Sequence, residues 1–114
     1  KSKGYKYSGS DNVDDVAWSP SNSGVITHEV GQKERNELGI YDMSGNVREW
    51  CSDCYSNYTS SAQTNPYNNS GSGRVYRGGS WLKDEVVVRV GGRDSNSPTY
   101  TYLDLGFRIA RTVA

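Results

Sequence analysis

The sequence predicts a small α+β domain that is mostly β and has long irregular loops. The chain of 114 residues is long enough for one small domain. Its β-favouring segments are short, and 13 glycines among many polar residues leave much of the chain to loops. Leu and Ile are few, so we expect the 9 Tyr and 3 Trp to supply much of the buried area.

The expected elements of the first half are few. Residues 1–24 are rich in Ser, Asp, Asn and Gly and predict loop, with a short strand or turn at the apolar cluster 13–18. Alternating side chains over residues 46–52 predict a half-buried strand. Residues 55–73 form a long polar excursion, and loops of that length are usually functional or mobile.

Strands dominate the expected second half. Residues 74–77 predict a short strand that ends at a glycine pair. The β-branched run at residues 86–90 predicts another strand, broken by the next glycine pair. Residues 105–112 predict the last strand, with Phe107 and Ile109 on one face.

The composition excludes several classes of function. Lys plus Arg and Asp plus Glu both number 13, so the formal net charge is zero and nothing favours binding to nucleic acid. The chain has no apolar run long enough for a membrane span and no visible signal peptide. Because it begins without Met, we expect residues 1–114 to be a single domain from the C-terminal part of a longer chain. The compartment is unknown from sequence, with the cell surface or extracellular space favoured.

The two cysteines, Cys51 and Cys54, form a C-x-x-C pair with three interpretations. The simplest is a buried thiol with a chance neighbour. A redox pair lacks the surrounding βαβ pattern. A zinc site needs two more ligands, and His28 is the one spare candidate.

Three motifs in a fixed order carry a family resemblance. They are GIYDMSGNVREW at residues 39–50, RVYRGGSW at 74–81 and LGFRIAR at 105–111. Together they resemble the formylglycine-generating-enzyme (sulfatase-modifying factor) family, which has a C-type-lectin-like fold. The resemblance covers about residues 4–112 and departs at Arg48, where the family usually has Trp.

The first motif contains a candidate calcium site. Calcium takes oxygen ligands, which the carboxylates of Asp42 and Glu49 and the carbonyls of Gly45 and Val47 offer. The resemblance implies a structural calcium ion at these four positions. The alternative is that Asp42 caps a turn while Glu49 pairs with an arginine.

The segment after the second motif determines whether such a domain is catalytic. Active members of the resembled family carry two cysteines there, which bind copper(I) and activate oxygen to convert a substrate cysteine to formylglycine. Thiolates are the soft ligands that copper(I) prefers. Residues 82–88 contain no cysteine, and Cys51 and Cys54 belong to a different motif. We therefore expect no copper and no enzymatic activity.

The residues that stand in place of the two cysteines predict a binding surface. A fixed scaffold around an idiosyncratic segment resembles the Treponema-type variable proteins of diversity-generating retroelements, which use this fold and mutate this segment to change ligand specificity. Tyr gives large contacts at low entropy cost, and Ser, Gly and Asn give adaptable hydrogen bonds. We expect the ligand to be an unknown protein or surface molecule. The predicted ligand-binding residues are Leu82, Asp84, Val87, Val88, Gly92, Asp94, Ser95, Asn96, Ser97, Tyr100, Tyr102, Leu103 and Asp104.

Other interpretations remain open. The valine run could be a buried strand and residues 100–102 an edge strand, in a binding paralogue that does not vary. A catalytic oxidoreductase relative with other chemistry, such as an iron enzyme, needs a His-rich site, and the chain has only His28. A calcium-dependent lectin of this fold uses a Glu-Pro-Asn or Gln-Pro-Asp tripeptide, for which residues 97–99 are no substitute.

Overall fold

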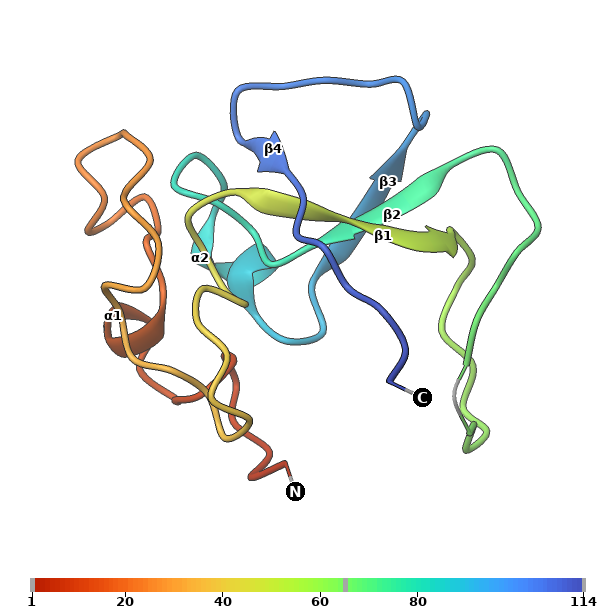
Figure 1. Cartoon of the computed structure of the whole chain (residues 1–114), viewed down its shortest axis with the longest axis horizontal. Coiled ribbons are helices and arrows are strands. Elements are labelled where there is room, and N and C mark those ends of the chain that lie inside the picture. The colour runs from red at the N-terminus through yellow and green to blue at the C-terminus, as the bar shows by residue number, and fades with distance from the viewer. Residues whose placement is uncertain (1, 65, 114) are drawn as a thin grey trace.

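A small mixed sheet organises the chain. The computed structural model describes residues 2–64 and 66–113, and within them one sheet has four strands in the order β3-β2-β1-β4 (Figure 1). The central pair and the β2–β3 pair are antiparallel, whereas β4 joins β1 in parallel. The predicted mostly-β α+β class is confirmed. The elements are α1 (Val13–Val16), β1 (Arg48–Cys54), β2 (Arg74–Arg77), α2 (Glu85–Val88), β3 (Arg93–Asn96) and β4 (Leu105–Gly106).

Strand β1 begins two residues later than the alternation predicts and continues to Cys54. The delay has a backbone cause, because Gly45 and Asn46 both have a positive φ, at 80° and 64°. Gly45 lies so close to Trp18 that a Cβ there would meet the Trp18 carbonyl oxygen at 2.6 Å. The extended strand therefore starts only after this turn.

Strand β2 matches the prediction for residues 74–77 and pairs with β1, placing Trp50 opposite Tyr76. Their rings meet edge to face with centroids 5.6 Å apart.

The predicted strand at residues 86–90 is wrong, because these valines form the one-turn helix α2. The Asp84 side chain caps this turn by accepting a hydrogen bond from the Val86 amide at 2.9 Å. Val88 is buried directly against Gly79, where an added Cβ would lie 2.6 Å from a Val88 methyl carbon. A local cap and a tertiary contact thus override the weak β preference of valine.

The last strand is much shorter than predicted, since only Leu105–Gly106 pairs with β1. Phe107 and Ile109 lie outside the sheet, with 74% and 91% of their surface exposed. Beyond Gly106 the chain is held by the Arg108 side chain, which donates to the carbonyl oxygens of Tyr41 and Asp42. Residues 93–96 form β3 and pair along their whole length with β2. Residues 100–102 form no strand.

A compact apolar cluster joins the N-terminal half to α2. It contains Tyr7, Val16, Ala17 and Val88, with Val13 packed against it. In Figure 1 the N-terminal half with α1 lies on one side, the sheet on the other, and α2 between them. This cluster therefore fixes α2 beside the sheet. Among the described residues, none of the helices has the length and apolar character needed to span a bilayer.

Candidate ligand-binding site

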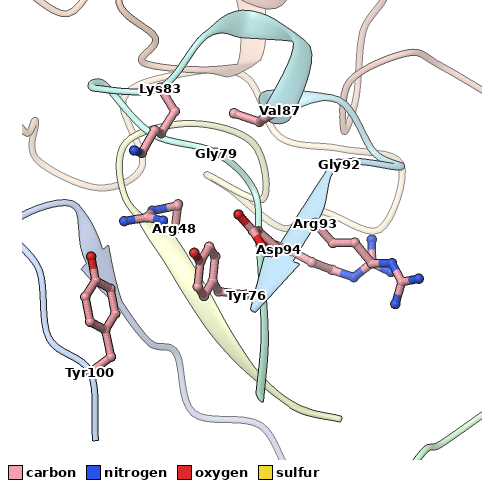
Figure 2. Close-up of a pocket in the computed structure, with 10 residues that line it drawn as sticks. Arg48, Tyr76, Gly79, Lys83, Val87, Gly92, Arg93, Asp94 and Tyr100 are labelled. Carbon is pink, nitrogen blue, oxygen red and sulfur yellow. The ribbon is translucent and has the colours of Figure 1, made fainter. Parts of the chain in front are cut away.

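A cavity of about 230 Å³ lies between α2 and the sheet. Figure 2 shows the side chains that surround it, drawn from β1, β2, α2 and β3, from the loops on either side of α2 and from the loop between β3 and β4. Four of the predicted ligand-binding residues reach it, namely Val87, Gly92, Asp94 and Tyr100. Six further lining residues were not predicted to bind ligand: Arg48, Tyr76, Arg77, Gly79, Lys83 and Arg93.

A buried ion pair forms the base of the site. The Arg48 Nη2 atom lies 2.6 Å from Asp104 Oδ1, with 8% of the Arg48 side chain and none of the Asp104 side chain exposed. The other carboxylate oxygen of Asp104 accepts a hydrogen bond from the Ser80 hydroxyl at 2.6 Å. The Arg48 amide also donates to the Asp104 carbonyl at 2.8 Å. Asp104 therefore anchors β1, the second motif and the end of the binding segment to one another.

The environment of Arg48 keeps its guanidinium charged and leaves one donor unused. Burial alone would lower its pKa, but the hydrogen bond and charge of Asp104 outweigh burial and raise the pKa. The guanidinium carbon lies 4.5 Å from the centre of the Tyr76 ring. The Arg48 Nε atom is buried and has no hydrogen-bond partner. Buried donors are nearly always paired, so this unpaired donor is an exception beside the cavity.

Polar ends of four side chains point toward one another over the cavity. Figure 2 shows the Lys83 ammonium, the Arg48 guanidinium and the hydroxyls of Tyr76 and Tyr100 converging. The Ser80 hydroxyl accepts from the Lys83 amide at 3.3 Å and so fixes the start of this loop. Burial, with a smaller contribution from Asp94, raises the pKa of Tyr76, so its hydroxyl stays protonated and able to donate.

The two remaining arginines of the site hold the long loop at residues 55–73. The Arg93 guanidinium carbon stacks 3.8 Å from the Tyr58 ring centre and 4.8 Å from that of Tyr55. Arg77 donates to the Tyr58 hydroxyl at 2.8 Å and to the Val90 carbonyl at 3.2 Å. The guanidinium groups of Arg77 and Arg93 therefore both contact the loop. In Figure 2 the Arg93 side chain points away from the Arg48–Tyr100 cluster.

The predicted binding segment divides into exposed and buried positions. Its aromatic feature is the pair of half-buried Tyr100 and exposed Tyr102, whose rings stack with centroids 6.0 Å apart. Val88 and Asp104, which were predicted to contact ligand, are both fully buried and are held by other parts of the chain. Gly92, Ser95 and Tyr100 are half-buried. The exposed members are Leu82, Asp84, Val87, Asp94, Asn96, Ser97, Tyr102 and Leu103.

The two carboxylates among the predicted calcium ligands, Asp42 and Glu49, both have partners within the protein. Glu49 pairs with Arg108, whose Nε donates to the Glu49 carboxylate at 2.8 Å. Asp42 accepts from the Gly31 amide at 2.7 Å, while its other carboxylate oxygen is buried without a partner. Over residues 2–64 and 66–113, no group of three His, Cys, Asp or Glu side chains could hold a metal ion. This geometry matches the alternative in which Glu49 pairs with an arginine, and calcium at Asp42, Gly45, Val47 and Glu49 stays a prediction.

Both thiols lie on β1 outside the cavity. Cys54 is buried, and Arg74 donates to its sulfur at 2.6 Å. Cys51 is half-buried, and this burial raises the pKa of its thiol. The two sulfurs are not bonded to each other. The arrangement agrees with the simplest of the three interpretations of the C-x-x-C pair.

Comparison with known proteins identifies the class. Residues 2–113 match the family model described as "Sulfatase-modifying factor enzyme 1-like domain". The chain therefore belongs to the sulfatase-modifying factor family, and the C-type-lectin-like fold of the formylglycine-generating-enzyme type is confirmed.

The individual relatives include a variable protein, a chaperone and an enzyme, as their names state. The "Treponema denticola variable protein 1" structure is 43% identical with a TM-score of 0.83, and the match covers 90% of this chain and 39% of that one. The chaperone protein LppX of Paenibacillus barcinonensis is 33% identical over 98% of this chain and 43% of its own length. The formylglycine-generating enzyme of Streptomyces coelicolor is 41% identical over 75% of this chain and 29% of its own length. The chain thus spans less than half the length of these relatives.

Proposed function

We propose that this chain is a non-catalytic ligand-binding domain whose binding surface is the face formed by residues 82–104 around the cavity. One observation carries the proposal. The cavity lies between segment 82–104 and strands β1 and β2 of the scaffold. In the described part of the chain, none of its lining residues is a cysteine. The likeness to a variable protein supports binding, with 43% identity and a TM-score of 0.83.

The chemistry of the exposed positions suits binding of a macromolecular ligand. Leu82, Tyr102 and Leu103 expose apolar surface beside the cavity segment, with 38%, 47% and 61% of each residue exposed. Tyrosines combine a large apolar face with a hydroxyl, and interface energy tends to concentrate in such anchors. Buried Val88 and Asp104 attach this segment to the fold at two points, so its exposed positions can face a ligand.

The binding proposal is tested with purified domain and a cell-surface extract, with capture quantified by mass spectrometry. We expect a Leu82→Ser/Tyr102→Ala variant to lose specifically captured proteins while its thermal unfolding stays unchanged. A control Val25→Ser/Leu38→Ala variant removes apolar side chains outside the segment that are more exposed than Leu82 and Tyr102, and it should capture as the wild type does. Equal loss of capture in both variants would contradict the assigned surface.

A catalytic function is the second candidate, because relatives at 41% identity include a formylglycine-generating enzyme. Its test is incubation of the domain with copper(I), oxygen and a cysteine-containing peptide, followed by mass spectrometry for the aldehyde product. We expect no product, since none of residues 82–88 is a thiol that could bind copper(I). Turnover that requires Cys51 or Cys54 would overturn the non-catalytic proposal.

A further inference from the structure

We infer that the cavity between α2 and the sheet binds one anionic group of the ligand, a carboxylate or a phosphate monoester. This inference rests on the proposed binding function and specifies the chemistry that the site selects. Four of the lining side chains are cationic, namely Arg48, Arg77, Lys83 and Arg93, against one carboxylate, Asp94. The Arg77 and Arg93 heads contact loop 55–73, so the cations that face the cavity are Lys83 and Arg48, with Asp104 paired behind Arg48 and Asp94 among the lining residues.

Two of these cations are available to a ligand. Within the described residues, the Lys83 side chain has no ion pair and no hydrogen-bond acceptor, and Figure 2 shows its ammonium directed toward the Arg48 head. The Arg48 side chain is more than nine-tenths buried and still has an unpaired Nε donor. The charge of Arg48 is already balanced by Asp104, so an anion placed between the two heads mainly compensates Lys83, through charge-assisted hydrogen bonds.

Neutral donors complete the anion site. The hydroxyls of Tyr76 and Tyr100 point into the same space as the two cationic heads. Because the pKa of Tyr76 is raised, its hydroxyl donates rather than repels an anion at neutral pH. A carboxylate or phosphate offers several oxygens and can accept from all of these groups together.

The size of the cavity limits what enters it. A volume of about 230 Å³ is below the usual range for whole drug-sized ligands, roughly 300–1,000 Å³. It suits a terminal group whose remainder lies outside, next to the stacked Tyr100 and Tyr102 rings. A cationic group finds only Asp94 to pair with, and the Asp94 carboxylate already accepts from the Ser95 amide at 2.7 Å.

The experiment is an NMR titration of the ¹⁵N-labelled domain with phenyl phosphate, inorganic phosphate, benzoate and the neutral analogue benzyl alcohol. We expect the anions, and not the neutral analogue, to shift the amides of Gly79, Lys83 and Gly92. Added salt should weaken this binding. Comparison of phenyl phosphate with benzoate distinguishes phosphate from carboxylate, and inorganic phosphate shows whether the anionic group suffices alone.

Three variants make the result specific. Lys83→Met should lower the affinity for the bound anion by about ten-fold, as expected for loss of one charge-assisted hydrogen bond. Lys3→Met makes the same charge change outside the cavity and should leave affinity unchanged. Asp94→Asn removes the opposing carboxylate and should tighten binding about three-fold. Because both active variants change exposed side chains, their spectra should remain those of the folded domain.

The outcomes separate this inference from the proposed function. If benzyl alcohol binds as well as phenyl phosphate, or if no anion shifts the cavity amides, the anion inference is wrong. If in addition the Leu82→Ser/Tyr102→Ala variant still captures its cell-surface proteins, the proposed surface is wrong as well. Loss of capture in that variant together with a failed titration would retain the binding function and reject only its anionic specificity.

Discussion

Replacing Asp104 by Ala should unfold or nearly unfold the domain, although the sequence alone suggests an exposed contact residue. The substitution leaves Arg48 buried with its charge unpaired and removes the acceptor of the Ser80 hydroxyl. Breaking a buried ion pair by removing one partner costs about 3–5 kcal/mol. That is a large part of the roughly 5–15 kcal/mol that stabilises a typical domain. Urea unfolding followed by tryptophan fluorescence measures the loss.

Companion variants test the cause of this loss. Arg48→Met/Asp104→Leu removes both charges and should be more stable than Asp104→Ala, because no buried charge stays unpaired. Glu49→Ala breaks the more exposed pair with Arg108, whose side chain is 37% exposed, and should cost less than about 1 kcal/mol. If Asp104→Ala lowers the free energy of unfolding by less than about 1 kcal/mol, Asp104 does not anchor the segment. Its original assignment to the ligand-binding surface would then be correct.

Three further predictions follow from particular contacts. Gly79→Ala should cost about 2 kcal/mol or more in urea unfolding, because Gly79 has a φ of +65° and a Cβ would press on Val88; Gly91→Ala, with open space around it, is the control. Burial raises the pKa of the Cys51 thiol in the folded state above its value in the unfolded state. The stability that this pKa difference contributes is complete below the unfolded thiol pKa of about 8.5, and it is lost as the pH rises through the folded pKa. Unfolding free energy should therefore fall above that pH, and less so in Cys51→Ser; equal slopes would refute this. If calcium binds at Asp42, calorimetry should detect it and Asp42→Asn should abolish it, whereas no heat in the wild type would exclude the site.

The sequence predicts the scaffold well because its motifs encode geometry locally. Gly45 shows this, since its φ of +80° lies in the region that favours glycine. Strand 74–77 is likewise correct, because a short β-favouring run ends at glycines with positive φ. Such positions constrain the backbone whatever surrounds them, so a pattern along the chain is enough to recognise them.

The errors occur where the structure depends on distant partners. The valine run is helical because Val88 packs against Gly79 and the N-terminal cluster, which no local pattern reveals. Asp104 looks like a surface residue among Tyr and Ser until its partner Arg48, 56 positions earlier, is placed beside it. One signal was available, because Arg48 departs from the Trp usual in the resembled family. A buried arginine requires a buried anion, and that requirement predicts a carboxylate somewhere in the later sequence.

The buried positions also explain how residues 82–104 are attached to the rest of the fold. Val88 and Asp104 attach the segment to the core at two points, and β3 attaches it to the sheet through backbone pairing with β2. The side chains of Asp94 and Asn96 on β3 are exposed and accept hydrogen bonds only from neighbouring backbone amides, those of Ser95 and Ser97. The Arg93 and Arg77 heads further tie loop 55–73 to the same face through Tyr58. Substitutions at the exposed positions therefore change the surface around the cavity, whereas changes at Val88 or Asp104 change the fold that presents it.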